Sequence, residues 1–165
     1  MICQLIRFLG IGNSKANNTN NNKSNTNPRA FKGIVVNCSR TANSQDNSDN
    51  VYVLDPSVPI TMKVVKAVIK QISHIFPSKY LHIGGDEVNI PCWEESKHLK
   101  TWSQGRNQSL LGSYQSFEAD IIQYTKTLNK IPIVWQGVQD SNAVPLHDTT
   151  TVVQPWKCWS NLALR

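Results

Sequence analysis

Two adjacent carboxylates, Asp86 and Glu87, directly follow two glycines, Gly84 and Gly85, within the segment 80–88. Such a pair can supply a general acid and a charged hydrogen-bond acceptor. Glycines allow a sharp backbone turn or a close approach to a ligand. An arbitrary Asp-Glu pair is more often a helix cap and an exposed surface charge. The two glycines, and a strand ending just before the pair, favour a functional site instead.

The elements around this pair follow the order helix, strand, helix, strand, loop, strand. Hydrophobic spacing predicts helices over 59–76 and 110–129, and β-branched or apolar runs predict strands over 80–85, 132–136 and 150–156. This order is typical of an α/β fold with a parallel sheet. In such sheets the carboxyl ends of the strands carry the active site. The carboxylates after the first of these strands therefore lie where chemistry is expected.

The first third of the chain differs in composition from the rest. The chain has 165 residues and a formal charge of +6, and residues 1–50 hold six basic but only two acidic side chains. The Asn-rich tract 13–29 predicts disorder because it has nothing to bury. We therefore expect a largely disordered Asn/Ser-rich leader over 1–50, interrupted by a short strand at 31–37, and a folded domain over 51–165.

Two classes of partner are disfavoured by the distribution of charge and hydrophobicity. No stretch of about 18 apolar residues is present, so we expect no helix that spans a membrane. Basic residues do not cluster on one face of a predicted element, as a nucleic-acid site requires. The sequence therefore predicts neither a membrane span nor a nucleic-acid partner.

The Gly-Gly-Asp-Glu segment also occurs in diguanylate cyclases, where Phe follows it on the tip of a β-hairpin. Here Val88 stands in place of the Phe, and Pro91 would break the strand that a hairpin needs next. A nucleotide cyclase is therefore disfavoured.

The segment instead resembles glycoside hydrolase family 20, the β-N-acetylhexosaminidases. The family signature His-x-Gly-Gly-Asp-Glu-Val matches 82–88, and its following Cys-Trp matches 92–93. The family's Val-Trp-Gln matches 134–136, and Pro155-Trp156-Lys157 stands in place of its Val-Trp-Lys. The resemblance covers about residues 51–157 and implies a partial TIM (β/α)₈ barrel that holds the middle strands. A complete barrel typically has about 250 residues.

The resemblance also implies the reaction and its residues. The reaction is hydrolysis of terminal non-reducing N-acetylhexosamine residues from glycans or glycoconjugates, with retention and with no cofactor or metal. Glu87 would be the general acid, and Asp86 would orient the substrate's 2-acetamido group, which serves as the nucleophile. Trp135 and Trp156 would wall the acetamido pocket, although composition alone favours a core position for such residues. His82 would at most support these groups.

The resemblance also implies a disulfide pairing and a cellular compartment. It implies a disulfide between Cys38 and Cys92, and the four cysteines lack the spacing of a zinc site. Asn107, in the sequon Asn-Gln-Ser, is a more credible glycan acceptor than the sequons of the Asn-rich tract, which arise by chance in such a composition. A lysosomal or secreted enzyme that is dimeric when intact is implied, although no targeting signal is evident in the sequence.

An alternative stays open, because the family also needs an Arg from an early barrel strand and a Tyr, a Trp and a Glu from late strands. These have no counterpart in the matched segment. The chain would then be a truncated, inactive remnant that binds a carbohydrate or a partner at most.

Overall fold

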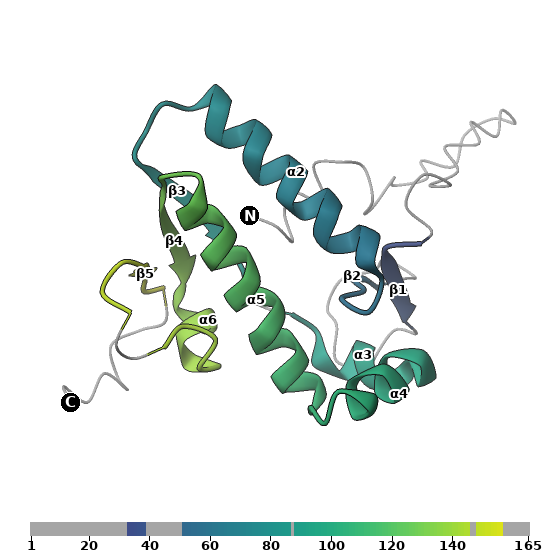
Figure 1. Ribbon diagram of the computed structural model, residues 1–165. Coiled ribbons are helices and arrows are strands. Elements are labelled where there is room, and N and C mark those ends of the chain that lie inside the picture. The colour runs from purple at the N-terminus through teal and green to yellow at the C-terminus, as the bar shows by residue number, and fades with distance from the viewer. Residues whose placement is uncertain (1–32, 39–50, 87, 146–147, 157–165) are drawn as a thin grey trace, which may run out of the picture.

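The computed structural model describes residues 33–38, 51–86, 88–145 and 148–156, without the side chains at positions 37, 38, 51 and 52 (Figure 1). Two antiparallel strands, a parallel sheet of three strands and five helices make up this part of the chain. In chain order they are β1 (Val35–Cys38), β2 (Val51–Leu54), α2 (Pro59–Ile75), β3 (Tyr80–Gly84), α3 (Ile90–Glu95), α4 (Lys97–Gly105), α5 (Leu110–Thr127), β4 (Ile131–Trp135), α6 (Gln136–Asp140) and β5 (Val152–Gln154).

Helix α2 confirms the helix predicted over 59–76 and ends one residue earlier. Pro59 occupies its first turn, where no intrahelical N–H bond is lost. Val65 and Ile69 are buried on its inner face. At its other end, the Lys130 ammonium donates to the carbonyl oxygens of Phe76 at 2.9 Å and Ser78 at 2.6 Å. A cation at the C-terminal end of a helix interacts favourably with the helix dipole, and it donates hydrogen bonds to carbonyl groups that have no partner within the helix.

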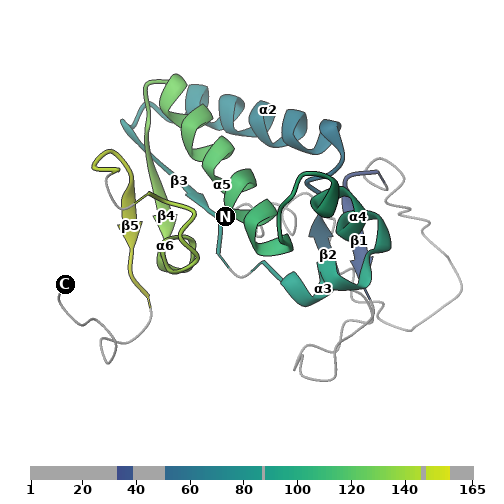
Figure 2. The ribbon, with the colours of Figure 1, turned by 60° about the horizontal axis from the view of Figure 1, so that its bottom comes forward.

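Helix α5 confirms the second predicted helix and packs between α2 and the parallel sheet. Ser109 caps its start, where its hydroxyl accepts the backbone N–H of Gly112 at 2.9 Å. Phe117, Ile121 and Ile122 are buried in the main core. Figures 1 and 2 show α2 and α5 side by side, with β3 and β4 alongside α5.

The parallel sheet has the strand order β3-β4-β5, which confirms the predicted α/β topology. Ile83 and Val134 point into the same core as the inner faces of α2 and α5. Because side chains alternate along a strand, His82 and Trp135 lie on the opposite face. Their rings pack together, with centroids 4.6 Å apart. The helices thus cover one face of the sheet, and the candidate site residues lie on the other.

A second, smaller core joins the β1–β2 hairpin to α3 and α4. Trp93 is buried in it, and its indole N–H donates to the carbonyl oxygen of Leu54 at 3.1 Å. Strand β1 confirms a strand in the segment predicted over 31–37, although it begins at Val35. Residues 1–32 and 39–50, where disorder is expected, lie outside the described residues, so the domain boundary at residue 50 stays a prediction.

Candidate active site

Asp86 lies directly beyond the carboxyl end of β3, at the end of a turn that glycine makes possible. Gly84 and Gly85 have φ angles of 78° and 95°, in a region that side-chain-bearing residues rarely adopt. The carboxylate of Asp86 is thereby placed at the strand edge where parallel sheets carry their sites. Glu87, the expected general acid, lies outside the described residues.

Trp135 and Trp156 lie at the same edge of the sheet as Asp86. Trp135 is the last residue of β4 and is half-buried, and Trp156 follows β5 by two residues with 49% of its surface exposed. Because β3, β4 and β5 run parallel, their carboxyl ends meet. Gln136 links the last two ends, since its side-chain oxygen accepts the backbone N–H of Trp156 at 3.3 Å. The structure therefore brings together the three predicted site residues that it describes.

His82 connects the end of β3 to Trp135. Its Nδ1 accepts the backbone N–H of Gly84 at 3.1 Å, and its ring is tilted by 56° against the Trp135 ring. Its Nε2 is buried without a hydrogen-bond partner among the described residues. Burial lowers the pKa of His82, although the nearby Gln154 amide opposes this effect. A neutral imidazole at this point supports the strand end and the Trp135 ring.

The glycine turn is tightly enclosed by the helices that follow. A methyl group added at Gly85 would lie 2.6 Å from Glu118 Oε2 and 2.8 Å from Val138 Cγ2. One added at Gly137, in α6, would lie 3.0 Å from the Cβ of Asp86. Helices α5 and α6 therefore both determine where Asp86 can sit.

Two residues of α5 that contact this turn were not predicted as part of the site. The Tyr114 hydroxyl donates to the carbonyl oxygen of Gly85 at 2.6 Å, a buried hydrogen bond. Glu118 is only 3% exposed. Burial, together with the charge of Asp86, raises the pKa of Glu118 to about 8. The sequence offers one signal for Glu118: it directly follows Phe117 within the buried face of a predicted helix. Charged side chains are rarely fully buried, so a Glu at such a position indicates a specific role.

Comparison with known proteins identifies the family. The model of the glycosyl hydrolase family 20 catalytic domain matches residues 17–165. This chain belongs to glycosyl hydrolase family 20. The family 20 match begins well before residue 51, where the sequence resemblance began, so it includes part of the segment expected to be a leader.

The relatives of this family 20 chain are β-hexosaminidases. It is 35% identical to beta-hexosaminidase 1 of Arabidopsis thaliana over 103 residues, which are 62% of this chain and 19% of that protein. It is 31% identical to the human beta-hexosaminidase subunit beta over 117 residues, which are 68% of this chain and 20% of that subunit. The chain thus spans about a fifth of the length of these relatives.

Solved family 20 structures share the fold. A Vibrio harveyi GH20 exo-β-N-acetylglucosaminidase in complex with N-acetylglucosamine superposes with a TM-score of 0.55 at 24% identity, over 74% of this chain and 18% of that one. Its D437A inactive mutant superposes with a TM-score of 0.58 at 21% identity, over 79% of this chain and 20% of that one. The mixed α/β arrangement described above is therefore that of part of a family 20 catalytic domain.

Cys92 of the family 20 chain is disulfide-bonded. Helix α3, which carries Cys92, contacts β1, and β1 ends at Cys38. The side chain of Cys38 lies outside the described residues, so the pairing of these two cysteines stays a prediction.

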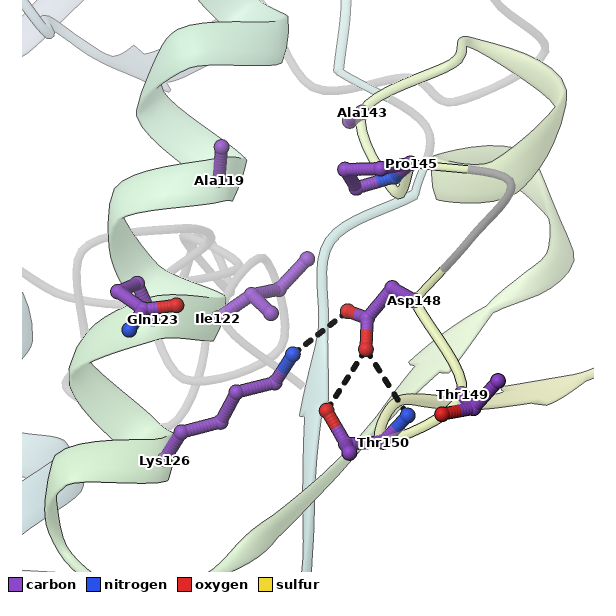
Figure 3. Close-up of a pocket in the computed structure, with 9 residues that line it drawn as sticks. All are labelled: Ala119, Ile122, Gln123, Lys126, Ala143, Pro145, Asp148, Thr149 and Thr150. Atoms are coloured by element: carbon purple, nitrogen blue, oxygen red, sulfur yellow. Dashed lines mark hydrogen bonds and ion pairs between the residues drawn. The ribbon is translucent and has the colours of Figure 1, made fainter.

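A pocket of about 390 Å³ lies away from the candidate site, between α5 and the segment that leads into β5 (Figure 3). Lys126 and Asp148 form an ion pair of 2.6 Å at its wall. Burial favours a higher pKa for Asp148, but hydrogen bonds from Lys126, Thr151 and Thr150 outweigh it and hold the pKa well below its usual range. Because the two charges neutralise each other, the ion pair has a structural role: it holds the loop before β5 against α5.

The described part of the family 20 chain holds neither a metal-binding cluster nor a membrane-spanning helix. No group of three His, Cys, Asp or Glu side chains there is arranged to hold a metal ion. None of the helices there is long and apolar enough to cross a membrane.

Proposed function

We propose that this chain is part of a TIM-barrel β-N-acetylhexosaminidase, of which it forms the middle strands. Its Asp86–Glu87 pair would hydrolyse terminal non-reducing N-acetylhexosamine residues of glycans or glycoconjugates. The observation that carries the proposal is the position of Asp86. It follows β3 by two residues within the segment that matches family 20, at the strand edge that also holds Trp135 and Trp156.

The adjacency of the two carboxylates favours a nucleophile supplied by the substrate. Most glycosidases place two carboxyl groups on opposite sides of the sugar. Consecutive residues at one strand end cannot easily flank a sugar ring in this way. In substrate-assisted catalysis, the carbonyl oxygen of the 2-acetamido group attacks the anomeric carbon with retention overall. Glu87 then protonates the leaving oxygen, and its carboxylate takes a proton back from the water that opens the cyclic intermediate.

Asp86 is assigned to the acetamido group. As a carboxylate it would accept the acetamido N–H, hold the carbonyl oxygen against the anomeric carbon and stabilise the positive charge that develops on the ring. The half-buried Trp135 is suited to wall the acetamido methyl group, because an aromatic face combines apolar area with a rigid shape. Trp156 is more exposed and would cover the outer side of the sugar.

The extent of the barrel supports a second candidate. The outer edges of β3 and β5 have no paired strand among the described residues, and Tyr80 of β3 and Val152 of β5 are exposed. Catalysis depends on binding energy from the whole substrate, and the rest of a barrel would supply much of it. A remnant that binds a carbohydrate or a partner without turnover is therefore the alternative.

Incubation with a β-linked N-acetylglucosamine disaccharide separates these two candidates. We expect release of the monosaccharide, measured by mass spectrometry, because Asp86 lies at the strand edge and Glu87 is the next residue in the sequence. Binding of the disaccharide in saturation-transfer NMR without release would support the remnant. Absence of both turnover and binding would contradict both candidates.

The compartment and the disulfide are part of the same proposal. We expect a lysosomal or secreted protein that is dimeric when intact, with Cys38 bonded to Cys92 and a glycan on the exposed Asn107. Such a disulfide persists in oxidising compartments. Peptide mapping of the unreduced chain should recover the two cysteine peptides joined. Recovery of Cys92 joined to a different cysteine would contradict the pairing.

A further inference from the structure

We propose that Tyr114 and Glu118 are positioning residues for Asp86, and that Glu118 does this as a neutral carboxyl group held against the Gly85 turn. The two residues lie one helical turn apart on α5 and therefore on the same face. They meet the turn from one side, through a hydrogen bond from Tyr114 and a close packing contact from Glu118. The role rests on the proposed function, because it concerns how that site is aligned.

Tyr114 holds the peptide that immediately precedes Asp86. Its hydroxyl donates to the Gly85 carbonyl oxygen at 2.6 Å, and the bond is buried. Orientation of this peptide plane also orients the Cα of Asp86, because the two share a backbone bond. A rigid aromatic side chain with one polar end is well suited to this task.

Glu118 holds the same turn by packing. A methyl group at Gly85 would lie 2.6 Å from Glu118 Oε2, so the carboxyl group fills the space that a larger residue would occupy. Val138 of α6 closes the other side at 2.8 Å from the same point. Oε2 is buried and has no hydrogen-bond partner among the described residues. Ionisation would place negative charge on a buried oxygen that no hydrogen bond from the described residues stabilises.

The surroundings of Glu118 within the described part of the chain favour its neutral form. Helix α6 meets it with the apolar Val138, and its own helix contributes the Tyr114 hydroxyl, which is donated to Gly85. Asp86 is the acidic group of the described residues that acts on it. Burial and this negative charge raise its pKa to about 8. A neutral Glu118 leaves the negative charge of the turn on Asp86, where the acetamido N–H is expected to bind.

Carboxyl ¹³C NMR of the full chain tests this coupling without reliance on turnover. Between pH 3 and pH 10, the Glu118 carboxyl signal should titrate near pH 8, and the Asp86 carboxyl signal should shift at the same pH because Glu118 ionises beside it. In Glu118→Gln, which mimics the neutral group, this shift of the Asp86 signal should disappear. The matched control is Asp120→Asn, at an exposed position of α5, which should keep the shift. A Glu118 signal that titrates near pH 4.5, or an Asp86 signal that does not shift near pH 8, would overturn the proposal.

The pH dependence of the unfolding equilibrium gives a second test of whether Glu118 is protonated in the folded chain. A folded-state pKa above the unfolded value means that the native chain keeps a proton that the unfolded chain loses. The stability that the Glu118 proton contributes to the fold is therefore fully present below about pH 4.5, and it falls as the pH rises to about 8. The Glu118 contribution should raise the unfolding constant by up to roughly tenfold per pH unit in this window. Urea titrations should show this component in the wild type and lack it in Glu118→Gln; equal pH dependence in both would contradict a neutral Glu118.

Tyr114→Phe tests positioning by the hydroxyl, since the ring is retained. If the chain turns over substrate, kcat should fall while the KM stays near the wild-type value, because Asp86 acts most strongly on the developing charge. An unchanged kcat would overturn the positioning role of Tyr114. If no variant and no wild-type protein turns over substrate, the proposed function fails while the NMR coupling still decides whether Glu118 acts on Asp86.

Discussion

Glu87→Gln is expected to lower kcat for a β-linked N-acetylglucosamine disaccharide by about 10²–10⁴-fold, the usual contribution of a general acid. The sugar leaving group is a poor one and needs a proton as the glycosidic bond breaks. The same variant should lose much less activity toward a 4-nitrophenyl N-acetyl-β-glucosaminide, because nitrophenolate leaves without protonation. Steady-state rates on the two substrates measure this difference.

Asp86→Asn and Glu94→Gln provide the comparisons for this experiment. Asp86→Asn should reduce both rates by similar factors, because the acetamido oxygen displaces either leaving group in the same step, and Asp86 orients that oxygen for both substrates. Glu94 is exposed on α3, so Glu94→Gln should leave both rates unchanged. A Glu87→Gln variant with equal losses on both substrates would contradict a general-acid role for this residue.

Gly85→Ala is expected to destabilise the fold by about 2–6 kcal/mol. The φ angle of 95° is unfavourable for alanine and costs about 1–3 kcal/mol. The added methyl group would meet Glu118 Oε2 and Val138 Cγ2 at 2.6 and 2.8 Å, and such overpacking costs about 1–3 kcal/mol more. Glu118 is buried and has little room to withdraw. Urea denaturation gives the free energy of unfolding of the variant.

Gly105→Ala is the matched control, because a methyl group there meets no atom within 4 Å and the position lies at the end of α4. It should be neutral or slightly stabilising, since alanine is the better helix former. In a Glu118→Ala background, Gly85→Ala should cost less than in the wild type, because one of the two close contacts is gone. Equal costs in the two backgrounds would mean that Glu118 does not confine the turn.

Much of the parallel part of the fold could be predicted because its signals are local. Pro59 begins a helix and Pro77 follows its end, and the strand before Gly84 is short, apolar and followed by two glycines. Parallel strands then place whatever follows them at one edge. The strand pattern thus predicts a site at the position of Asp86, and the family resemblance adds Trp135 and Trp156 to the same edge.

The rest depends on contacts that local patterns do not contain. Strand β2 has four residues and is recognisable only by its pairing with β1. Pro91 is expected to prevent a strand after the acid pair, and a helix stands there instead: Pro91 lies in the first turn of α3, a position that proline favours, although α3 itself is not predicted. Glu118 could not be connected to Asp86, because the two are distant in sequence and meet only when α5 packs against the turn after β3.

The central claim is that the acid pair acts with the substrate's own acetamido group. The most direct test compares kcat/KM for 4-nitrophenyl N-acetyl-β-glucosaminide and 4-nitrophenyl β-glucoside, which differ only at the 2-position and share one leaving group. The account predicts turnover of the first and at least ~10²-fold slower turnover of the second, because a positioned nucleophile is missing. Comparable rates on the two substrates would contradict it.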